Sequence, residues 1–351
     1  MTVEPHELIW TLTNAGVAAR CLHVVASLGV ADHVDEQSVS ADDLAQRCAA
    51  DPDALDRVLR LLAAHGVFDA TEDGYRHTPA SRLLRTDHAM TMGAFPQMMD
   101  LPAMTRAFAD LAYSIRTGRP ALELTAPDGG WAYLAREPAQ QAVFARAMTA
   151  KAAGDTAAVL AAYDFSSRRR IVDVGGGRGH LLHAVLEAAP QAQGILFDLP
   201  DVVGAGGPAH PRLTRRAGDF FVDSLPAGDT YLLMEVLHDW ADAEAIDILG
   251  AVRQAAPQDA RVLIIENLLQ EATLDPRGQT LDVIMLAVTG GRERTPSDLG
   301  ALLGKAGLRL TRVTDTYGPL RIAEAVLVPE NTSHPVPTVA VTLKTKSTGT
   351  V

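Results

Sequence analysis

The sequence has few of the residues that stabilise small secreted proteins or bind nucleic acid. Of its 351 residues only Cys21 and Cys48 are cysteines, too few for a disulfide framework or a closed structural zinc site. The formal net charge is −12, which disfavours non-specific attraction to nucleic acid or to an anionic membrane. The low cysteine count favours a reducing, cytoplasmic setting, and the negative charge favours a partner that is not a polyanion.

Lysine is also scarce, because only four of the 31 basic residues are lysines. This argues against Schiff-base chemistry, which needs a desolvated lysine. The P-loop pattern, the G-x-S-x-G nucleophile motif and C-x-x-C pairs are missing. The N-terminus has no basic stretch followed by an apolar one, and no segment approaches the about 20 apolar residues that cross a bilayer. We therefore expect a soluble protein outside these enzyme classes.

The length and composition predict two folded domains and a loose tail. Hydrophobic residues make up 47% of the chain, enough for a large buried core, and about 150 residues per domain is the usual size. The pattern of apolar residues is helical over most of the first part and changes near residue 168. We expect a helical, winged-helix dimerisation domain over residues 1–165, a second domain over 166–329 and a flexible tail over 330–351.

Residues 40–78 have the pattern of a winged helix: two short helices, then two short strands around the Asp73-Gly74 turn. The obvious function of such a unit is DNA binding. However, residues 41–90 hold six arginines against nine acidic residues, and Asp53 and Asp56 lie on the helix that would read DNA. A structural or dimerising role is therefore favoured, and a DNA-binding regulator is the less favoured alternative.

From about residue 168 strands and helices alternate. Apolar runs at 171–174, 195–197, 231–234 and 262–265 are separated by helical segments, which is typical of a mostly parallel sheet covered on both faces. Two further strands, near 309–314 and 322–328, are joined without a helix, so the last is expected to run antiparallel. The predicted class is α/β, with a Rossmann-like sheet.

A glycine-rich turn follows the first of these strands, where residues 173–179 read Asp-Val-Gly-Gly-Gly-Arg-Gly. Such a turn lets backbone amides approach a ligand closely. The dinucleotide fingerprint needs a glycine where His180 stands, and Asp173 would repel a pyrophosphate but attract an ammonium group. The next strand ends at Asp198, which can bind ribose hydroxyls. The third ends at residues 218–220, Gly-Asp-Phe, which offer a carboxylate and a ring to a base. Three acids at three strand ends indicate a cationic nucleoside, S-adenosylmethionine.

The fourth strand ends in Leu-His-Asp-Trp at residues 237–240, so a histidine lies where open α/β sheets bind their substrates. A phenol, with a pKa near 10, is a poor nucleophile until a base removes its proton, and a histidine with a pKa of about 6.5 can do so. Glu266, at the end of the fifth strand, and Glu293, before a helix-capping sequence, could each orient the imidazole of His238. Each of these residues could instead have a purely structural role.

A metal site is not expected. His180 and His183 are one helical turn apart, which can hold a metal, but the sequence offers no obvious third ligand.

Taken in order, these motifs resemble those of the S-adenosylmethionine-dependent O-methyltransferases of the caffeic acid and hydroxyindole type, especially bacterial members that tailor natural products such as antibiotics. The resemblance covers about residues 10–328. It implies a class I methyltransferase fold, a homodimer formed through the N-terminal domain, and a small phenolic substrate from secondary metabolism. The implied catalytic residues are His238, the base, with Glu266 and Glu293. The implied cofactor-binding residues are Asp173, Gly175, Gly177, Asp198, Gly218, Asp219, Phe220 and Trp240. The implied substrate-binding residues are Phe144, Met148, Asp239 and Met285.

The sequence departs from this family in two places. Met234 stands where many members have a lysine, four residues before the histidine, and the segment ending at Thr289 is one residue shorter than in plant relatives. The first change puts one cofactor contact in question and the second alters the acceptor wall. The same fold and cofactor also support C- or N-methylation, hydroxylation or cyclisation. The intact histidine–acid pair favours O-methylation.

Overall fold

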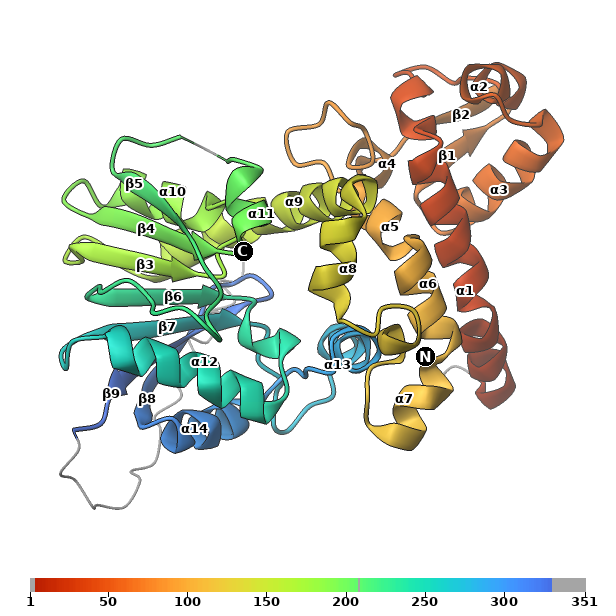
Figure 1. Cartoon of the computed structure of the whole chain (residues 1–351). Helices are drawn as coiled ribbons and strands as arrows, with labels where there is room; N and C mark the ends of the chain where they lie inside the picture. The colour runs from red at the N-terminus through yellow and green to blue at the C-terminus, as the bar shows by residue number, and fades with distance from the viewer. Residues whose placement is uncertain (1–3, 208, 330–351) are drawn as a thin grey trace, which may run out of the picture. The chain divides into compact units, whose positions relative to one another are not determined.

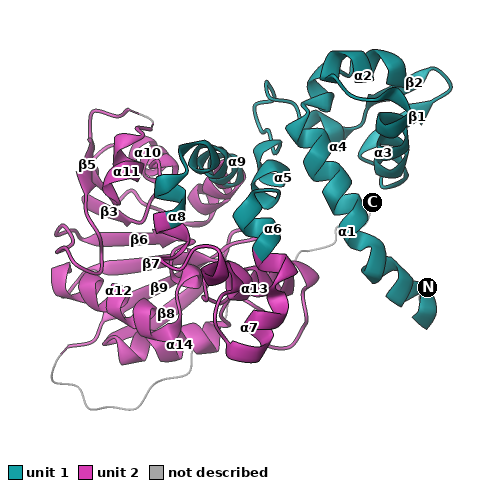
Figure 2. Cartoon of the chain, turned by 45° about the vertical axis from the view of Figure 1, so that its right-hand side comes forward, with its two compact units in different colours: residues 1–106, 133–151 teal, residues 107–132, 152–351 magenta. Residues whose placement is uncertain are grey.

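A computed structural model describes residues 4–207 and 209–329, and the predicted tail over 330–351 lies outside the described residues. The chain forms two compact units, unit 1 with residues 1–106 and 133–151, and unit 2 with residues 107–132 and 152–351 (Figure 2). The domain boundary predicted after residue 165 falls in the loop between α9 (Pro138–Ala162) and β3 (Arg170–Val174), and it stays a prediction.

Unit 1 is helical with one small hairpin. Its elements are α1 (Pro5–Ser27), η1 (Val30–His33), α2 (Ala41–Cys48), α3 (Pro52–Ala64), β1 (Phe68–Thr71), β2 (Gly74–His77), α4 (Pro79–Arg82) and α5 (Ala94–Met99). The helices α6 (Pro102–Ala109), α8 (Gly130–Arg136) and α9 have residues in both units. Ser40 and Asp51 begin α2 and α3 by accepting hydrogen bonds from amides of the first turn. Helices α1 to α3 and the hairpin share one buried core, as the winged-helix pattern predicts.

Helix α1 is the one described helix that is long and apolar enough to cross a membrane, judged by length and composition alone. No such segment was expected from the sequence, and core helices of soluble proteins and signal sequences pass the same test. Only 6% of its most hydrophobic window is buried, and Ile9, Trp10 and Leu12 are each more than half exposed. An exposed apolar helix face of this kind is typical of an interaction surface.

Unit 2 is built on a seven-stranded sheet with the order β5-β4-β3-β6-β7-β9-β8 (Figure 1). Its other strands are β4 (Gln193–Asp198), β5 (Leu213–Ala217), β6 (Thr230–Met234), β7 (Arg261–Glu266), β8 (Leu308–Asp315) and β9 (Arg321–Leu327). Its helices are α7 (Leu111–Thr117), η2 (Ala121–Leu124), α10 (His180–Ala188), α11 (Pro200–Gly204), η3 (Leu237–Asp239), α12 (Asp242–Ala255), α13 (Pro276–Val288) and α14 (Pro296–Lys305). Strands β3 to β7 run parallel, and β9 pairs antiparallel with β7, as expected for the last strand.

Both faces of the sheet are buried, which explains why its strands have continuous apolar runs. On β6, Tyr231 and Leu233 pack on one face in a cluster with α12 and α14. Leu232, between them, packs on the opposite face in a cluster with α10 and the end of α9. Because side chains alternate along a strand, each face takes every second residue.

The sheet also fixes where functional residues can gather. Strands β3 and β6 are neighbours, although β4 and β5 lie between them in the sequence, so the chain reverses its direction of winding between them. In open α/β sheets ligands bind at the carboxyl ends of the strands beside such a switch point. A ligand of this sheet is therefore expected at the carboxyl ends of β3, β4, β6 and β7.

Candidate active site

His238 lies in a short 3-10 turn, η3, that follows β6 at the carboxyl edge of the sheet. Between strand and turn, Glu235 has a φ of 55°, a left-handed conformation that non-glycine residues rarely adopt. Such backbone strain persists only where the surrounding structure holds it, and it is common beside functional sites. The sharp reversal directs the chain into η3 and leaves His238 only 7% exposed.

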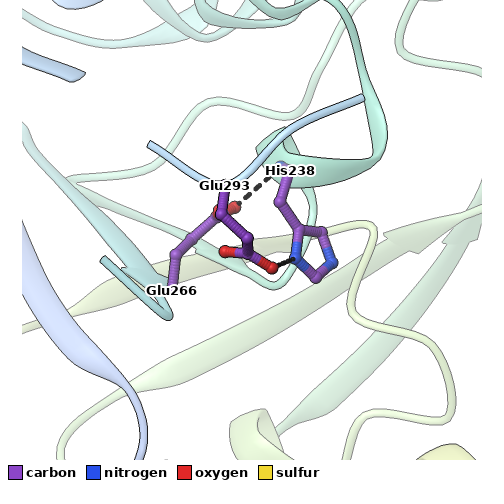
Figure 3. Close-up of side chains that lie close together, drawn as sticks. All are labelled: His238, Glu266 and Glu293. Atoms are coloured by element: carbon purple, nitrogen blue, oxygen red, sulfur yellow. Dashed lines mark hydrogen bonds and ion pairs between the residues drawn. The ribbon is translucent and has the colours of Figure 1, made fainter. Parts of the chain in front are cut away.

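The side chains of Glu293 and Glu266 both lie beside His238, with the carboxylate of Glu293 at the imidazole ring (Figure 3). The Nδ1 of His238 is 3.0 Å from Oε1 of Glu293, so Glu293 is the acid that contacts the imidazole. Oε1 of Glu266 instead accepts hydrogen bonds from the amides of Leu237 (2.7 Å) and His238 (3.2 Å). The sequence left open which acid orients the ring, and the geometry divides the two tasks. Glu293 contacts the ring and Glu266 holds the backbone.

The hydrogen bond to Glu293 also distinguishes the two ring nitrogens. A carboxylate can only accept, so Nδ1 carries a hydrogen and Nε2 is the nitrogen at which the neutral ring can take up a proton. Asp239 lies near this second nitrogen, with Oδ1 at 3.7 Å from Nε2. The arrangement can therefore receive a proton on one side of the ring and stabilise the resulting charge from the other.

Buried charges shift the pKa values of this cluster strongly. Burial alone lowers the pKa of His238, but Asp239, and then Glu293 and Glu266, outweigh it and raise the pKa to about 10. Burial raises the pKa of Glu266 to about 7, opposed by the positive charges of His238 and Arg294. The carboxylates around His238 thus favour its imidazolium form in the ligand-free protein.

His238, Glu266 and Glu293 each offer a ligand atom, and these atoms lie within 4.8 Å of one another. That spacing could hold a metal ion. However, Glu266 already accepts two backbone amides, and Glu293 accepts the imidazole N–H. These hydrogen bonds account for the closeness of the three side chains without a metal.

The segment before α14 is held in place by backbone hydrogen bonds on both sides of Glu293. The amide of Arg292 donates to the carbonyl of His238 at 2.8 Å. A Cβ on Gly291 would lie 2.0 Å from that same carbonyl oxygen, so only glycine allows this approach. Asp282, on α13, accepts a hydrogen bond from the amide of Glu293 at 2.9 Å. Sequence reasoning missed Asp282, because nothing in the local pattern of a helix shows that one of its acids reaches a distant loop.

The glycine turn forms the second part of the site. Gly175, Gly177 and Gly179 all have positive φ, which explains the glycine at each position. The amide of Gly177 donates to Oδ2 of Asp198 at 2.7 Å, so the ends of β3 and β4 are joined. A Cβ on Gly175 would approach Val236 and Phe220, so this turn lies close to the chain that leads into η3.

Asp173 is a buried acid of this turn whose hydrogen bonding is incomplete. It is 1% exposed, and neither carboxylate oxygen has a hydrogen-bond partner within bonding geometry among the described residues. Burial, and then the charge of Asp198, raises its pKa to about 7, opposed weakly by the amide of Leu182. A buried polar group without a partner is costly, so the site is suited to a ligand that brings a donor or a positive charge. The residues therefore fit the ammonium group of S-adenosylmethionine.

Aromatic side chains line the far end of this region. The ring centroids of Phe220 and Trp240 are 5.8 Å apart, and that of Phe221 lies 4.8 Å from Phe220 and 4.7 Å from Trp240. The carboxylate of Asp219 accepts the amide of Phe221. A Cβ on Gly218 would lie 2.5 Å from the ring of Phe197, so packing alone already requires this glycine. The adenine-binding roles of these residues stay predictions.

The predicted substrate residues lie on separate elements. Phe144 and Met148 are one turn apart on the part of α9 that belongs to unit 1, and both are half-buried. Met285 is a buried residue of α13 in unit 2, and Asp239 follows His238. Met234 ends β6 and packs against the buried cluster under α10. Contact of any of these residues with an acceptor or cofactor stays a prediction.

Two known families match most of the described chain. The O-methyltransferase domain family matches residues 108–309, and the O-methyltransferase dimerisation domain family matches residues 10–87. A phenazine O-methyltransferase of Lysobacter antibioticus is 38% identical, over 87% of this chain and 91% of its own length. A mitomycin biosynthesis 6-O-methyltransferase of Streptomyces lavendulae is 37% identical, over 87% and 90%.

Solved structures agree with these matches. Human N-acetylserotonin methyltransferase in complex with S-adenosylmethionine superposes with a TM-score of 0.86 at 25% identity, over 93% of this chain and 99% of that one. An O-methyltransferase from neocarzinostatin biosynthesis, in complex with S-adenosylmethionine and 2-hydroxy-5-methyl naphthoic acid, gives 0.73 at 33% identity, over 88% and 96%. A different acceptor atom occurs in an 8-amino-8-demethylriboflavin N,N-dimethyltransferase of Streptomyces davaonensis, 36% identical over 83% of this chain and 87% of its own length.

Proposed function

This chain belongs to the O-methyltransferase family of natural-product tailoring enzymes, with S-adenosylmethionine as cofactor, and we propose that it methylates a phenolic hydroxyl of a small aromatic molecule with His238 as general base. The observation that carries the proposal is the contact between Nδ1 of His238 and Glu293 at 3.0 Å. It leaves Nε2 as the proton acceptor at the edge of the sheet where substrates of such folds bind.

The bound cofactor would supply an electrophilic methyl group on a sulfonium. Asp173 would hold its ammonium group, Asp198 its ribose, and Asp219, Phe220 and Trp240 its adenine. Gly175 and Gly177 would allow the backbone to approach it, and the close fit of Gly218 on Phe197 would keep the loop in place. This division of tasks places positive charge near the turn that carries His238.

The raised pKa of His238 is compatible with this role. A base must be neutral to accept a proton, and in the ligand-free protein the charges of Asp239, Glu293 and Glu266 raise the pKa of His238 and so favour the imidazolium. A cation bound nearby disfavours the imidazolium, because like charges repel. We therefore expect His238 to lose its proton more readily once the cofactor site is filled. Glu293 and Glu266 would then stabilise the imidazolium that forms again when the phenol gives up its proton.

The test is methyl transfer from isotope-labelled S-adenosylmethionine to a panel of catechols, hydroxynaphthoates, hydroxyphenazines and aminophenols, read by mass spectrometry. A labelled product methylated at oxygen, lost in His238→Ala, is the expected result. Binding of the cofactor with no product from any acceptor would contradict a phenolic substrate. Turnover unchanged in His238→Ala would contradict the assignment of the base.

N-methylation is the second candidate, because a relative of similar identity carries the name of an N,N-dimethyltransferase. An amine of an aromatic acceptor loses its proton at nitrogen during transfer and could use the same base. Aminophenols in the panel offer both atoms to the enzyme at once. Fragmentation of the labelled product shows which atom carries the methyl group.

We also propose that the protein acts as a homodimer in the cytoplasm. The dimerisation family matches residues 10–87, and the exposed apolar side chains of α1 provide a surface that a second copy could bury. The molar mass in solution, measured by light scattering, is expected to be about twice the 37.3 kDa of one chain. A mass of one chain at micromolar concentration would contradict this proposal.

A further inference from the structure

Arg294 is a buried arginine that the proposed chemistry does not use. Its side chain is only 4% exposed, and it follows directly after Glu293. The guanidinium reaches back to the turn that carries His238. Its Nη1 donates to the carbonyl of Leu237 at 2.8 Å, and its Nη2 donates to the carbonyl of Trp240 at 2.9 Å. These carbonyls lie on either side of His238 and Asp239.

We propose that Arg294 is a positioning residue for methyl transfer, which fixes the direction of the His238 imidazole by binding the carbonyls before and after it. The inference rests on the proposed function, because it takes His238 as the base. Arg294 itself touches neither ring nitrogen. It acts through the backbone of residues 237–240.

The neighbouring contacts show why this turn depends on side chains. Glu266 accepts the amides of Leu237 and His238, and the amide of Arg292 donates to the carbonyl of His238. A 3-10 turn this short has few hydrogen bonds of its own, so its orientation is set by what surrounds it. Glu266 thus binds backbone amides of the turn, and Arg294 binds backbone carbonyls of the same turn.

The ion pair of Arg294 with Asp242 does not explain its burial. Nη2 and Nε of Arg294 lie 2.8 Å and 3.2 Å from Oδ1 of Asp242, but the side chain of Asp242 is 47% exposed. Ion pairs with a solvated partner contribute little to stability. The two backbone carbonyls are the buried partners, and only a planar guanidinium can donate to both in fixed directions. A lysine offers a point charge at this place without that geometry.

A small error in the direction of a catalytic base lowers the reaction rate strongly. A displacement of about 1 Å at a reacting group can reduce turnover by a factor of roughly 100. We expect kcat to fall by roughly 10- to 100-fold in both Arg294→Gln and Arg294→Lys, with the acceptor found by the panel. The dissociation constant of S-adenosylhomocysteine, measured by calorimetry, is expected to change by less than about threefold.

Two further variants separate the possible causes. Asp242→Asn removes the ion pair and keeps both carbonyl contacts, so its kcat is expected to stay within about threefold of the wild type. Arg309→Gln removes an exposed arginine on β8 and controls for the loss of a positive charge. A fall in Asp242→Asn equal to that in Arg294→Gln would show that the ion pair matters and would overturn the proposal. Full activity in Arg294→Lys would do the same, since charge alone would then suffice.

The ring signals of His238 give a readout that needs no acceptor. Nitrogen-15 spectra of the histidine side chains, assigned by comparison with His238→Gln, report which ring nitrogen carries the hydrogen. We expect the Nδ1 signal to change in Arg294→Gln and Arg294→Lys but not in Asp242→Asn. Unchanged ring signals together with unchanged kcat would show that Arg294 is dispensable. If the wild type methylates no acceptor, the proposed function fails, while these spectra still decide whether Arg294 positions the ring.

Discussion

Two halves of the site differ in how their buried polar groups are satisfied. At the ends of β6 and β7, the turn with His238 has its amides, carbonyls and ring bound by Glu266, Glu293 and Arg294. At the end of β3, Asp173 is equally buried, but its oxygens find no hydrogen-bond partner among the described residues. In the first half the backbone of the turn and Nδ1 of His238 are bound within the chain, although Oε2 of Glu293 has no partner among the described residues. In the second half both oxygens of Asp173 lack a partner among the described residues, so a ligand could supply the donor.

This difference allows one site to hold an ordered imidazole and also to bind a ligand through an unpaired carboxylate. A base must be held in a fixed direction before the substrate arrives, since ordering it during the reaction would add to the barrier. A binding group gains affinity if its hydrogen bonds are formed only with the ligand. The costly burial of Asp173 in the ligand-free protein is therefore consistent with a group whose partner is the cofactor. Variants in the half with His238 should therefore lower kcat and keep cofactor affinity, whereas variants in the half with Asp173 should weaken cofactor binding.

The largest effect is expected in His238→Gln, where the proposed base is lost and the proposed cofactor half is untouched. We expect kcat to fall by roughly 10²- to 10⁴-fold, the usual contribution of a positioned base. The dissociation constant of S-adenosylhomocysteine should stay within about threefold. His65→Gln, an exposed histidine after α3, is the control. If cofactor binding were lost along with kcat, the two halves would not be independent.

Asp173→Asn should show the reverse pattern. The loss of a charge-assisted hydrogen bond, about 1.5–3 kcal/mol, is expected to weaken S-adenosylhomocysteine roughly 10- to 100-fold, measured by calorimetry. Asp201→Asn, an exposed aspartate on α11, is the control. Equal affinity in Asp173→Asn and the wild type would contradict the ammonium-binding role.

The same variant tests the raised pKa of Asp173. Its pKa is about 7 in the folded protein against about 3.8 when exposed, so the folded state disfavours the charged form. The stability that the protonated carboxyl contributes is present below pH 4 and is lost as the pH rises through about 7. Without ligand, the Tm of the wild type should therefore fall over this range relative to Asp173→Asn.

The sequence predicted the strand ends that carry the site better than the contacts made there. Asp173, Asp198 and His238 could be placed because each lies near the carboxyl end of an apolar run, and parallel strands bring such ends to one edge. The division of work between Glu266 and Glu293 could not be predicted, since it depends on how a loop far along the chain folds back on η3. Asp282 and Arg294 were missed for the same reason. The exposure of α1 was missed because its apolar residues fit a buried helix equally well.

A smaller effect is expected when the two glutamates are exchanged for glutamine. Glu293 raises the pKa of His238 through a hydrogen bond and through its charge, whereas Glu266 acts through its charge alone. The rise of kcat/KM with pH, measured at saturating cofactor, should therefore move to lower pH in Glu293→Gln, and by less in Glu266→Gln. Protonated His238 stabilises the fold below its exposed pKa of about 6.5, and this is lost as the pH rises through about 10. Glu293→Gln should thus also lower the Tm at neutral pH. Equal shifts in both variants would contradict the separate roles.

The smallest effect is expected at Asp282, which supports Glu293 only through a backbone amide. Asp282→Ala removes the acceptor of that amide, and one net hydrogen bond is worth about 1 kcal/mol. If part of this cost appears as misplacement of Glu293, kcat should fall about two- to fivefold, with cofactor affinity unchanged. Asp282→Asn keeps an acceptor oxygen and should recover most of the loss. A fall in kcat as large as that in Glu293→Gln would mean that α13 orders the half of the site with His238 as much as η3 does. The contacts within η3 and its neighbouring loop would then not be enough to explain why that half is ordered without a ligand.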